Sequence, residues 1–190
     1  MCTDHFERVF VTSDLRAIAV GRLVPVKRFD FLIQAWNNIP IHISIVGDGP
    51  ERLRLETLVA NLGLQDRVSF LGERSDVQDL FTDHQLLVAT SESEGFGYVF
   101  LEALQEKLVV ISTATGIAAD LIPHDYLIDP LSVERVSLKV EKTLREFERA
   151  KQDFESVWAR ARDLTVKKMV TETLTTYQDT LSLKSKFEKT

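Results

Sequence analysis

The stretch LLVATSESEGFGYVFLE, residues 86–102, joins a short apolar run, a polar turn with two glycines and an apolar segment at helical spacing. A short apolar run bounded by polar residues is typical of a buried strand. Gly95 and Gly97 permit backbone angles closed to other residues and let the main chain approach a ligand closely. The amides of Gly97, Tyr98 and Val99 would then open a helix, whose N-terminus suits an anionic or hydroxyl-rich ligand.

Two glutamates frame this turn. Glu94 lies in the turn itself, and Glu102 follows eight residues later inside the predicted helix. At about 3.6 residues per turn, Glu102 lies deeper in the helix, but its long side chain can still reach the mouth of the turn. This spacing is equally compatible with two solvated glutamates, so the surrounding elements have to decide between the alternatives.

Short apolar runs alternate with helical segments along the first 130 residues, which favours an α/β fold with an open parallel sheet and helices on both faces. The expected strands are 17–20, 42–46, 68–71, 86–89, 109–112 and 126–128. Pro50 and Gly63 are expected to bracket one helix, and Ser75 with Gln78 forms a capping-box pattern for another. Ligands bind beyond the carboxyl ends of such strands, so the loops that follow them should converge on one edge.

We expect three segments along the chain. Residues 1–16 are interpreted as a linker into the domain, 17–150 as a Rossmann-like nucleotide-sugar-binding domain and 151–190 as a helical tail. Ser132 is a plausible N-cap for the helix before the tail. Within 151–190, one apolar stripe should pack on the sheet or on a partner; it starts with Phe154, Val157, Trp158 and Ala161 and is continued by Val170, Leu174 and Tyr177.

Composition narrows the class of function. The chain has 190 residues, 44% hydrophobic content and a formal net charge of -6, which gives no general attraction to nucleic acid. Its single cysteine, Cys2, excludes an internal disulfide, and the scattered histidines indicate no zinc site. No apolar run is long enough to span a membrane. We therefore expect a cytoplasmic location, with at most peripheral association at the inner membrane face.

The first predicted loop carries two cations, Arg22 and Lys27. Arginine suits bidentate contact with phosphate and lysine a point-charge contact, so the pair could hold a diphosphate; both could equally be ordinary surface cations. The neighbouring Arg28 is expected to be solvated. Gly47-Asp48-Gly49 starts a dinucleotide fingerprint, but Arg52 occupies the third glycine position, so that motif fails.

These motifs, in this order, resemble the C-terminal, donor-binding domain of a retaining GT-B glycosyltransferase of group 1, family 4. The resemblance rests on Gly21-Arg22 with Lys27, the turn 46–50, the strand 68–72 and the E-x7-E run from Glu94 to Glu102. It covers residues 3 to 130 and, more weakly, the tail. Thr3 to Phe6 resembles the segment just past the interdomain linker of that family, so we expect an excised or truncated half without its N-terminal acceptor domain.

The resemblance implies a function and a role for each motif. The implied enzyme moves a sugar from a nucleoside diphosphate sugar, most commonly a UDP- or GDP-sugar, to a glycan or lipid-linked acceptor in polysaccharide biosynthesis, without metal or other cofactor. Arg22 and Lys27 would neutralise the diphosphate and stabilise the leaving nucleotide, and Glu102 would accept from the ribose hydroxyls. The donor sugar would be held by Glu94 and the backbone that follows it, with implied donor-binding residues Gly21, Gly95, Phe96, Gly97, Tyr98 and Val99. Residues 72–77 would lie beside the base.

Two departures and two alternatives remain at this point. The family has a glycine pair and a glutamate after its fifth strand, whereas Thr115-Gly116 is followed by no glutamate before Asp120. A glycine normally found before the sixth strand is absent from residues 124–126. The alternatives are a sugar-nucleotide epimerase or isomerase of similar architecture, and a nucleotide-binding module without catalysis.

Overall fold

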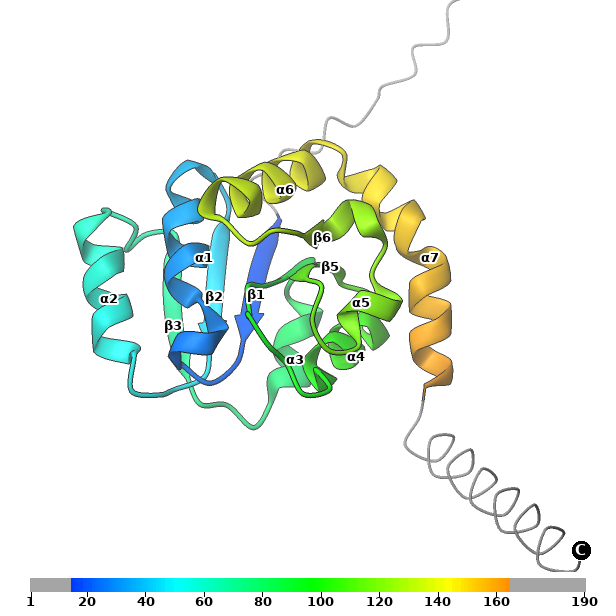
Figure 1. Cartoon of the computed structure of the whole chain (residues 1–190), viewed down its shortest axis with the longest axis horizontal. Coiled ribbons are helices and arrows are strands. Elements are labelled where there is room, and N and C mark those ends of the chain that lie inside the picture. Colours follow the sequence, from blue (N-terminus) through cyan, green and yellow to red (C-terminus); the bar gives the residue numbers. More distant parts are fainter. Residues whose placement is uncertain (1–14, 165–190) are drawn as a thin grey trace, which may run out of the picture.

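The computed structural model describes residues 15–164 of the chain (Figure 1). The predictions for residues 1–14 and for Val170, Leu174 and Tyr177 lie outside the described residues. Within 15–164, no helix has the combination of length and apolar character that crossing a membrane requires.

A six-stranded sheet with the order β3-β2-β1-β4-β5-β6 forms the centre of the fold, and all its pairings are parallel. Its strands are β1 (Arg16–Val20), β2 (His42–Val46), β3 (Val68–Gly72), β4 (Leu86–Ala89), β5 (Val109–Thr113) and β6 (Leu127–Ile128). Strands β4 and β5 are buried along almost their whole length, because helices cover both faces of a parallel sheet. The predicted open parallel sheet is therefore confirmed.

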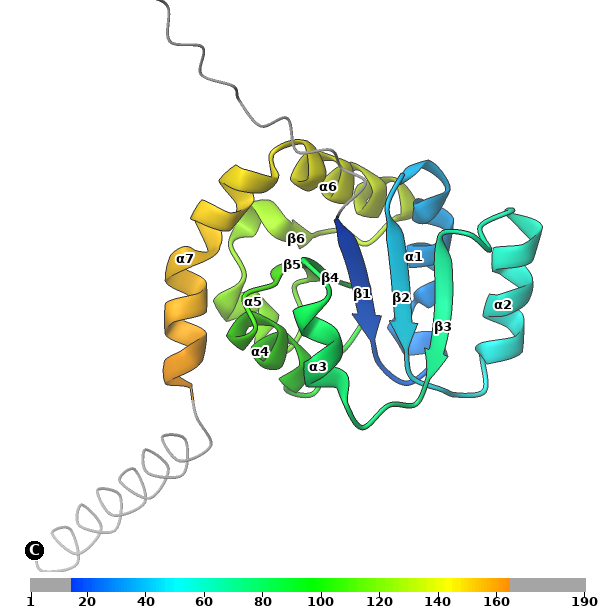
Figure 2. The ribbon, with the colours of Figure 1, turned by 180° about the vertical axis from the view of Figure 1, so that it is seen from behind.

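Helices cover the two faces (Figures 1 and 2). Helices α1 (Phe29–Ala35), α2 (Arg52–Asn61) and α6 (Val133–Arg145) lie on one face, where α1 packs against both of the others. On the other face α3 (Val77–Thr82) packs against α4 (Tyr98–Gln105), which also contacts α7 (Phe147–Asp163). The remaining elements are α5 (Ala118–Leu121), η2 (Pro25–Lys27), η3 (Trp36–Asn38) and η4 (His124–Tyr126).

Two predicted helix starts are wrong. Helix α2 begins at Arg52 rather than Pro50, because the amide of Glu51 donates to the carbonyl of Leu23 at 3.1 Å and holds the preceding turn against the first loop. The capping box at Ser75 does not form: α3 begins after Asp76, whose carboxylate is bound by Arg74 at 2.6 Å. At Pro50 a hydrogen bond to a distant loop, and at Ser75 an arginine–aspartate pair, outweighed the local sequence pattern that predicted the helix start.

The predicted cap of α6 is confirmed, since Ser132 Oγ accepts from the amide of Arg135 at 3.2 Å. Helix α7 then runs without a break through residue 150, where the sequence suggested a boundary, and contacts α4 and β5. Phe154 is fully buried, and Trp158 Nε1 donates to the carbonyl of Leu108 at 2.9 Å. Burial of each such side chain contributes about 1.5–3 kcal/mol, so the part of the tail up to residue 163 is packed on the domain.

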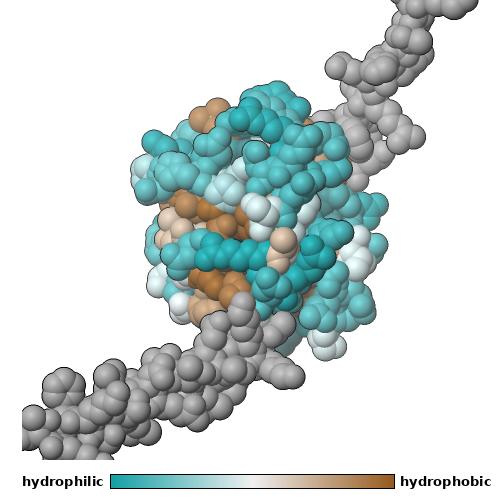
Figure 3. Space-filling view, turned by 90° about the vertical axis from the view of Figure 1, so that its right-hand side faces the viewer, coloured by the Kyte–Doolittle hydropathy of each residue, from teal (hydrophilic) through white to brown (hydrophobic). Residues whose placement is uncertain are grey.

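Figure 3 shows the side of the molecule that carries α7. Most of this surface is hydrophilic, and hydrophobic residues emerge near its middle, in an area crossed by a hydrophilic band. The hydrophilic surface is consistent with α7, whose apolar stripe of Phe154, Val157 and Trp158 is turned inward.

Candidate functional site

The loops that follow the strands meet at the carboxyl edge of the sheet, as predicted, and backbone hydrogen bonds join them. The amide of Gly21 donates to Val46 O at 2.9 Å, and the amide of Gly47 donates to Gly72 O at 2.7 Å. Across the centre of the sheet, the amide of Glu92 donates to Val26 O at 2.8 Å. The first, second, third and fourth loops are therefore one connected surface.

Two glycines of the second loop make this approach possible. A Cβ added at Gly47, where φ is 133°, would lie 2.0 Å from Gly21 O. A Cβ at Gly49 would lie 2.4 Å from Leu23 O. A Cβ atom essentially never lies this close to a non-bonded carbonyl oxygen. Both positions therefore require glycine if the first and second loops are to touch.

Lys27 and Glu94 form an ion pair at the centre of this surface. Lys27 Nζ lies 2.5 Å from Glu94 Oε1, although 67 residues separate them in the sequence. Their side chains are 20% and 11% exposed, respectively. Ser91 Oγ donates to the same carboxylate oxygen at 2.6 Å. Glu94 is therefore not one of two solvated glutamates. It is largely buried and accepts hydrogen bonds from Lys27 and Ser91.

Hydroxyl groups below the pair fix the two loops that carry it. Thr90 Oγ1 lies 3.0 Å from the carbonyl oxygens of both Lys27 and Arg28. Thr113 Oγ1, at the end of β5, donates to Ser91 O at 2.6 Å. The sequence analysis did not identify Thr90, Ser91 or Thr113 as parts of the site. The available signal was their position at the carboxyl ends of two strands: Thr90 and Ser91 follow β4, and Thr113 is the last residue of β5.

The prediction that Arg28 is solvated is wrong. Its side chain is 23% exposed, its Nε donates to Asp30 Oδ1 at 3.1 Å, and its Nη1 pairs with Glu92. Its guanidinium carbon lies 3.6 Å from the centroid of the Phe31 ring. The hydrogen bond to Asp30 raises the pKa of the Arg28 guanidinium above its ordinary value; burial opposes this effect and Glu92 adds to it.

The predicted helix N-terminus is present at α4. Gly97 caps it with φ 84°, and a Cβ there would lie 2.6 Å from the Phe100 ring. The rings of Phe96 and Tyr98 are 4.7 Å apart, and Tyr98 is 59% exposed. Gly95 is exposed, Val99 is half-buried at the first turn, and Glu102 is half-buried one turn further along.

Gly116 supports the turn from the fifth loop. A Cβ at this residue, where φ is 53°, would lie 2.6 Å from Phe96 O. The amide of the next residue, Ile117, donates to that same oxygen at 2.8 Å. Gly116 therefore allows the fifth loop to pack closely against the turn that carries Glu94.

Arg22 lines a cleft beside the loop that carries Lys27. It is exposed and lines a cleft of about 420 Å³ at the carboxyl ends of β1 and β2. Glu73, Arg74 and Val77 line the same cleft, whereas Lys27 does not. The structure thus brings Arg22 beside Glu73, Arg74 and Val77 and pairs Lys27 with Glu94. The Lys27 side chain also lies against Gly21, the residue before Arg22: a Cβ added at Gly21 would lie 3.7 Å from Lys27 Nζ.

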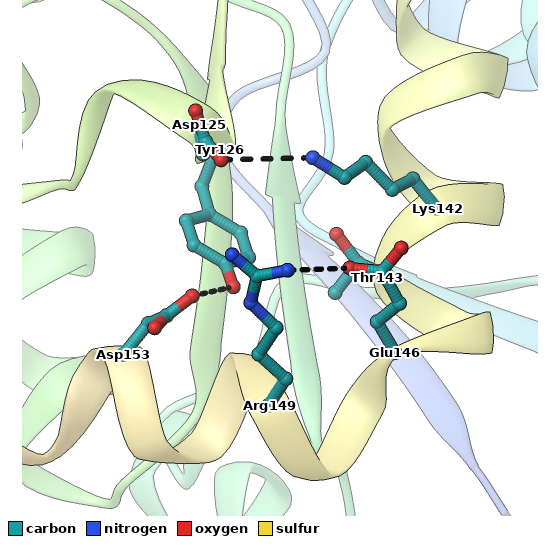
Figure 4. Close-up of a pocket in the computed structure, with 7 residues that line it drawn as sticks. All are labelled: Asp125, Tyr126, Lys142, Thr143, Glu146, Arg149 and Asp153. Carbon is teal, nitrogen blue, oxygen red and sulfur yellow. Dashed lines mark hydrogen bonds and ion pairs between the residues drawn. The ribbon is translucent and has the colours of Figure 1, made fainter.

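A second polar cluster lies between η4, α6 and α7 (Figure 4). Its lining residues are Asp125, Tyr126, Lys142, Thr143, Glu146, Arg149 and Asp153. Tyr126 Oη donates to Asp153 Oδ2 at 2.8 Å; burial, and then this hydrogen bond, raise the pKa of Tyr126. The cavity holds only about 10 Å³, the space of one water molecule. We interpret this cluster as structural.

Within residues 15–164, no group of three or more histidine, cysteine, aspartate and glutamate side chains is placed to hold a metal ion.

His84 is buried and neutral, which predicts an acid-sensitive fold. Its Nδ1 lies 2.6 Å from Leu80 O and its Nε2 lies 3.0 Å from Ser44 Oγ, and desolvation lowers its pKa. The unfolded chain therefore binds a proton that the folded chain resists. The contribution of His84 to stability should be fully present above pH ~7.5 and fall as the pH drops through the unfolded value near ~6.5, by up to about 1.4 kcal/mol per pH unit.

Urea unfolding between pH 8 and pH 5 measures this dependence. His84→Gln should flatten the slope, and His124→Gln, a change at an exposed residue, should leave it as in the parent. His42, whose pKa burial also lowers, should account for the remaining slope. A slope that survives unchanged in His84→Gln would contradict the assignment.

The family described as glycosyl transferases group 1 matches residues 3–154. N-acetyl-alpha-D-glucosaminyl L-malate synthase of Bacillus anthracis is 35% identical over 116 residues, which are 59% of this chain and 30% of that protein. The amylovoran biosynthesis glycosyltransferase AmsD of Erwinia amylovora is 25% identical over 84% of this chain and 47% of its own length.

Among solved structures, Anabaena Alr3699/HepE in complex with UDP and glucose superposes with a TM-score of 0.78 and 26% identity. The match covers 86% of this chain and 49% of that one. The chain therefore spans half or less of the length of these relatives. The fold expected from the resemblance, the Rossmann-like C-terminal part of a GT-B protein, is confirmed.

Proposed function

This chain belongs to the glycosyl transferases of group 1, and from that premise we propose that it binds the nucleoside diphosphate sugar in a retaining, metal-independent transfer to a glycan or lipid-linked acceptor. The observation that carries this proposal is the Lys27–Glu94 pair, which lies at the mouth of the loop that opens helix α4. It lies at the carboxyl edge of a parallel sheet, where such folds bind their ligands.

Each part of this edge has a chemical task in the proposal. Lys27 exchanges its partner Glu94 for a phosphate oxygen of the donor, and Arg22 adds a second cation from the neighbouring cleft. The free amides at the start of α4 face the same charge. Cations placed where charge develops on the leaving nucleoside diphosphate lower the barrier to its departure. Glu94, released from Lys27, accepts hydroxyls of the sugar, and Glu102 accepts those of the ribose.

Support for a nucleoside diphosphate sugar as donor comes from the Anabaena protein, which is described in complex with UDP and glucose. We propose a UDP- or GDP-linked sugar. The acceptor would be bound by a second domain facing this edge, with the protein in the cytoplasm or peripherally on the inner membrane face. No metal ion is needed in this proposal, because the cations and the helix N-terminus meet the diphosphate charge.

Calorimetric titration with UDP, GDP, ADP and their glucose or N-acetylglucosamine derivatives tests the proposal. We expect one base to be preferred, the sugar-bearing form to bind more tightly than the bare diphosphate, and EDTA to leave both affinities unchanged. A bare module would show no sugar preference, and an epimerase would convert the sugar without any acceptor. Failure of every nucleotide to bind at millimolar concentration would refute the proposal.

The two glutamates should fail in different ways. Glu94→Ala should abolish the preference for the sugar-bearing form while keeping or improving affinity for the bare diphosphate, because it frees Lys27. Glu102→Ala should weaken both ligands by about 0.5–1.5 kcal/mol, the scale of one hydrogen bond. Glu106→Ala, an exposed change just past the end of α4, is the matched control. Identical profiles for Glu94→Ala and Glu102→Ala would disprove the separate roles.

A further inference from the structure

Arg28 has an unusual backbone conformation for a residue with a side chain. Its φ is 49° and its ψ is 40°, and Lys107 is the only other non-glycine residue with positive φ in the described part of the chain. Glycine would adopt this left-handed conformation freely, whereas a Cβ makes it unfavourable. Such a conformation persists where the surroundings over-determine it. The side chain of Arg28 must therefore contribute something that glycine could not.

The side chain of Arg28 contacts two carboxylates and one aromatic ring. Two carboxylates, those of Asp30 and Glu92, neutralise the guanidinium, and the face of Phe31 covers it. Arginine is suited to this arrangement, because its planar group can pair at its edge and stack on its face at the same time. Because two carboxylates already meet the charge of Arg28, it is not assigned as a third cation for the diphosphate.

Arg28 also connects the two loops that carry the candidate catalytic pair. Lys27 is the last residue of η2, and the amide of Arg28 closes that turn by donating to Pro25 O at 3.1 Å. Glu92 stands two residues before Glu94 in the other loop. The Arg28–Glu92 bridge and the Lys27–Glu94 bridge therefore run side by side between the same two segments.

We propose that Arg28 is a positioning residue whose bridge to Glu92 and stacking on Phe31 hold Lys27 and Glu94 in register with each other before the donor binds. This inference rests on the proposed function, since it concerns the site assigned to the nucleoside diphosphate sugar. It assigns Arg28 no contact with the ligand. Its contribution is to hold together the two segments that carry the phosphate-binding cation and the sugar-binding carboxylate, which lowers the ordering cost of binding.

Three variants separate positioning from folding. Arg28→Gly removes the bridge but also relieves the backbone, so the chain should still fold. Arg28→Lys keeps a positive charge that can pair with one carboxylate. An ammonium group cannot bridge Asp30 and Glu92 as a planar guanidinium does, and it cannot stack on Phe31. Lys107→Gly is the matched control: it relieves the same backbone conformation at an exposed residue between α4 and β5, on the opposite edge of the sheet.

The first measurement needs no nucleotide. The rate at which limiting acetic anhydride acetylates Lys27 Nζ, followed by mass spectrometry, reports how firmly Glu94 holds the ammonium group. Arg28→Gly should raise this rate by about two- to fivefold, the scale of one partly exposed ion pair, and Arg28→Lys by less. Lys107→Gly should leave the rate at the parent value. An unchanged Lys27 rate in Arg28→Gly would overturn the inference.

The second measurement is the affinity for the nucleoside diphosphate and its sugar derivative. Arg28→Gly should weaken the sugar derivative more than the bare diphosphate, because only the sugar derivative engages both Lys27 and Glu94. Equal affinity in Arg28→Gly and the parent, with Lys27→Ala impaired, would refute the positioning role and leave the proposed function standing. If no nucleotide binds the parent, the proposed function fails, and the acetylation rates alone decide whether Arg28 positions Lys27.

Discussion

Lys27→Ala should weaken nucleoside diphosphate binding by about 1.5–3 kcal/mol, the scale of a charge-assisted hydrogen bond. The expectation follows from its position: the Lys27 side chain is 20% exposed and lies at the ligand edge of the sheet, and its ammonium group can leave Glu94 for a phosphate oxygen. Isothermal titration of the parent and the variant with the preferred diphosphate measures the difference.

Two controls accompany this prediction. Lys142→Ala removes a half-exposed lysine of α6, whose Nζ lies 3.6 Å from the Asp125 carboxylate on η4. It should leave the affinity for the nucleoside diphosphate unchanged. The double variant Lys27→Ala with Glu94→Ala removes both charges, so it tests whether a loss of affinity in the single variant comes from the unpaired Glu94 carboxylate. Parent affinity in Lys27→Ala would exclude Lys27 from the diphosphate site.

Gly47→Ala should have the largest effect on stability, at about 3 kcal/mol or more, because it combines backbone strain with direct overlap. Its φ of 133° disfavours a side chain, and its Cβ would lie 2.0 Å from the carbonyl oxygen of Gly21. Neither atom can move away cheaply, since both belong to backbone held by hydrogen bonds between adjacent strand ends. Strain of this kind costs about 1–3 kcal/mol before any overlap is counted.

Gly63→Ala is the matched control for the backbone term alone. Its φ is 67°, but nothing lies within 4 Å of an added Cβ, so it should lose only about 1 kcal/mol. Urea denaturation of both variants measures the difference between them. Equal losses in Gly47→Ala and Gly63→Ala would show that the first and second loops can separate, and would remove the basis for treating them as one surface.

The four central strands, β1, β2, β4 and β5, were predictable because each is a short apolar run whose residues are mostly buried. Strands β2 and β4 have the predicted bounds, 42–46 and 86–89. The start of α4 was predictable for a related reason, since Gly97 caps it and only glycine readily takes φ 84°. Local signals failed where charged or distant groups competed with them, as at Ser75 and at the turn before Arg52.

The amino-acid sequence by itself therefore determined the parallel sheet, the edge at which its loops converge and the candidate residues Lys27 and Glu94, because periodicity and glycine placement act over a few neighbouring residues. Only the tertiary structure decided which of those residues touch. One partner of Arg28, Glu92, is 64 residues away in the sequence, and the partner of Lys27, Glu94, is 67 residues away. Such pairings depend on strand order and loop contacts, which bring β1 beside β4 in space. The same physics explains why Lys27 pairs with Glu94 whereas Arg22, five residues earlier and alike in charge, lines a cleft with Glu73 and Arg74.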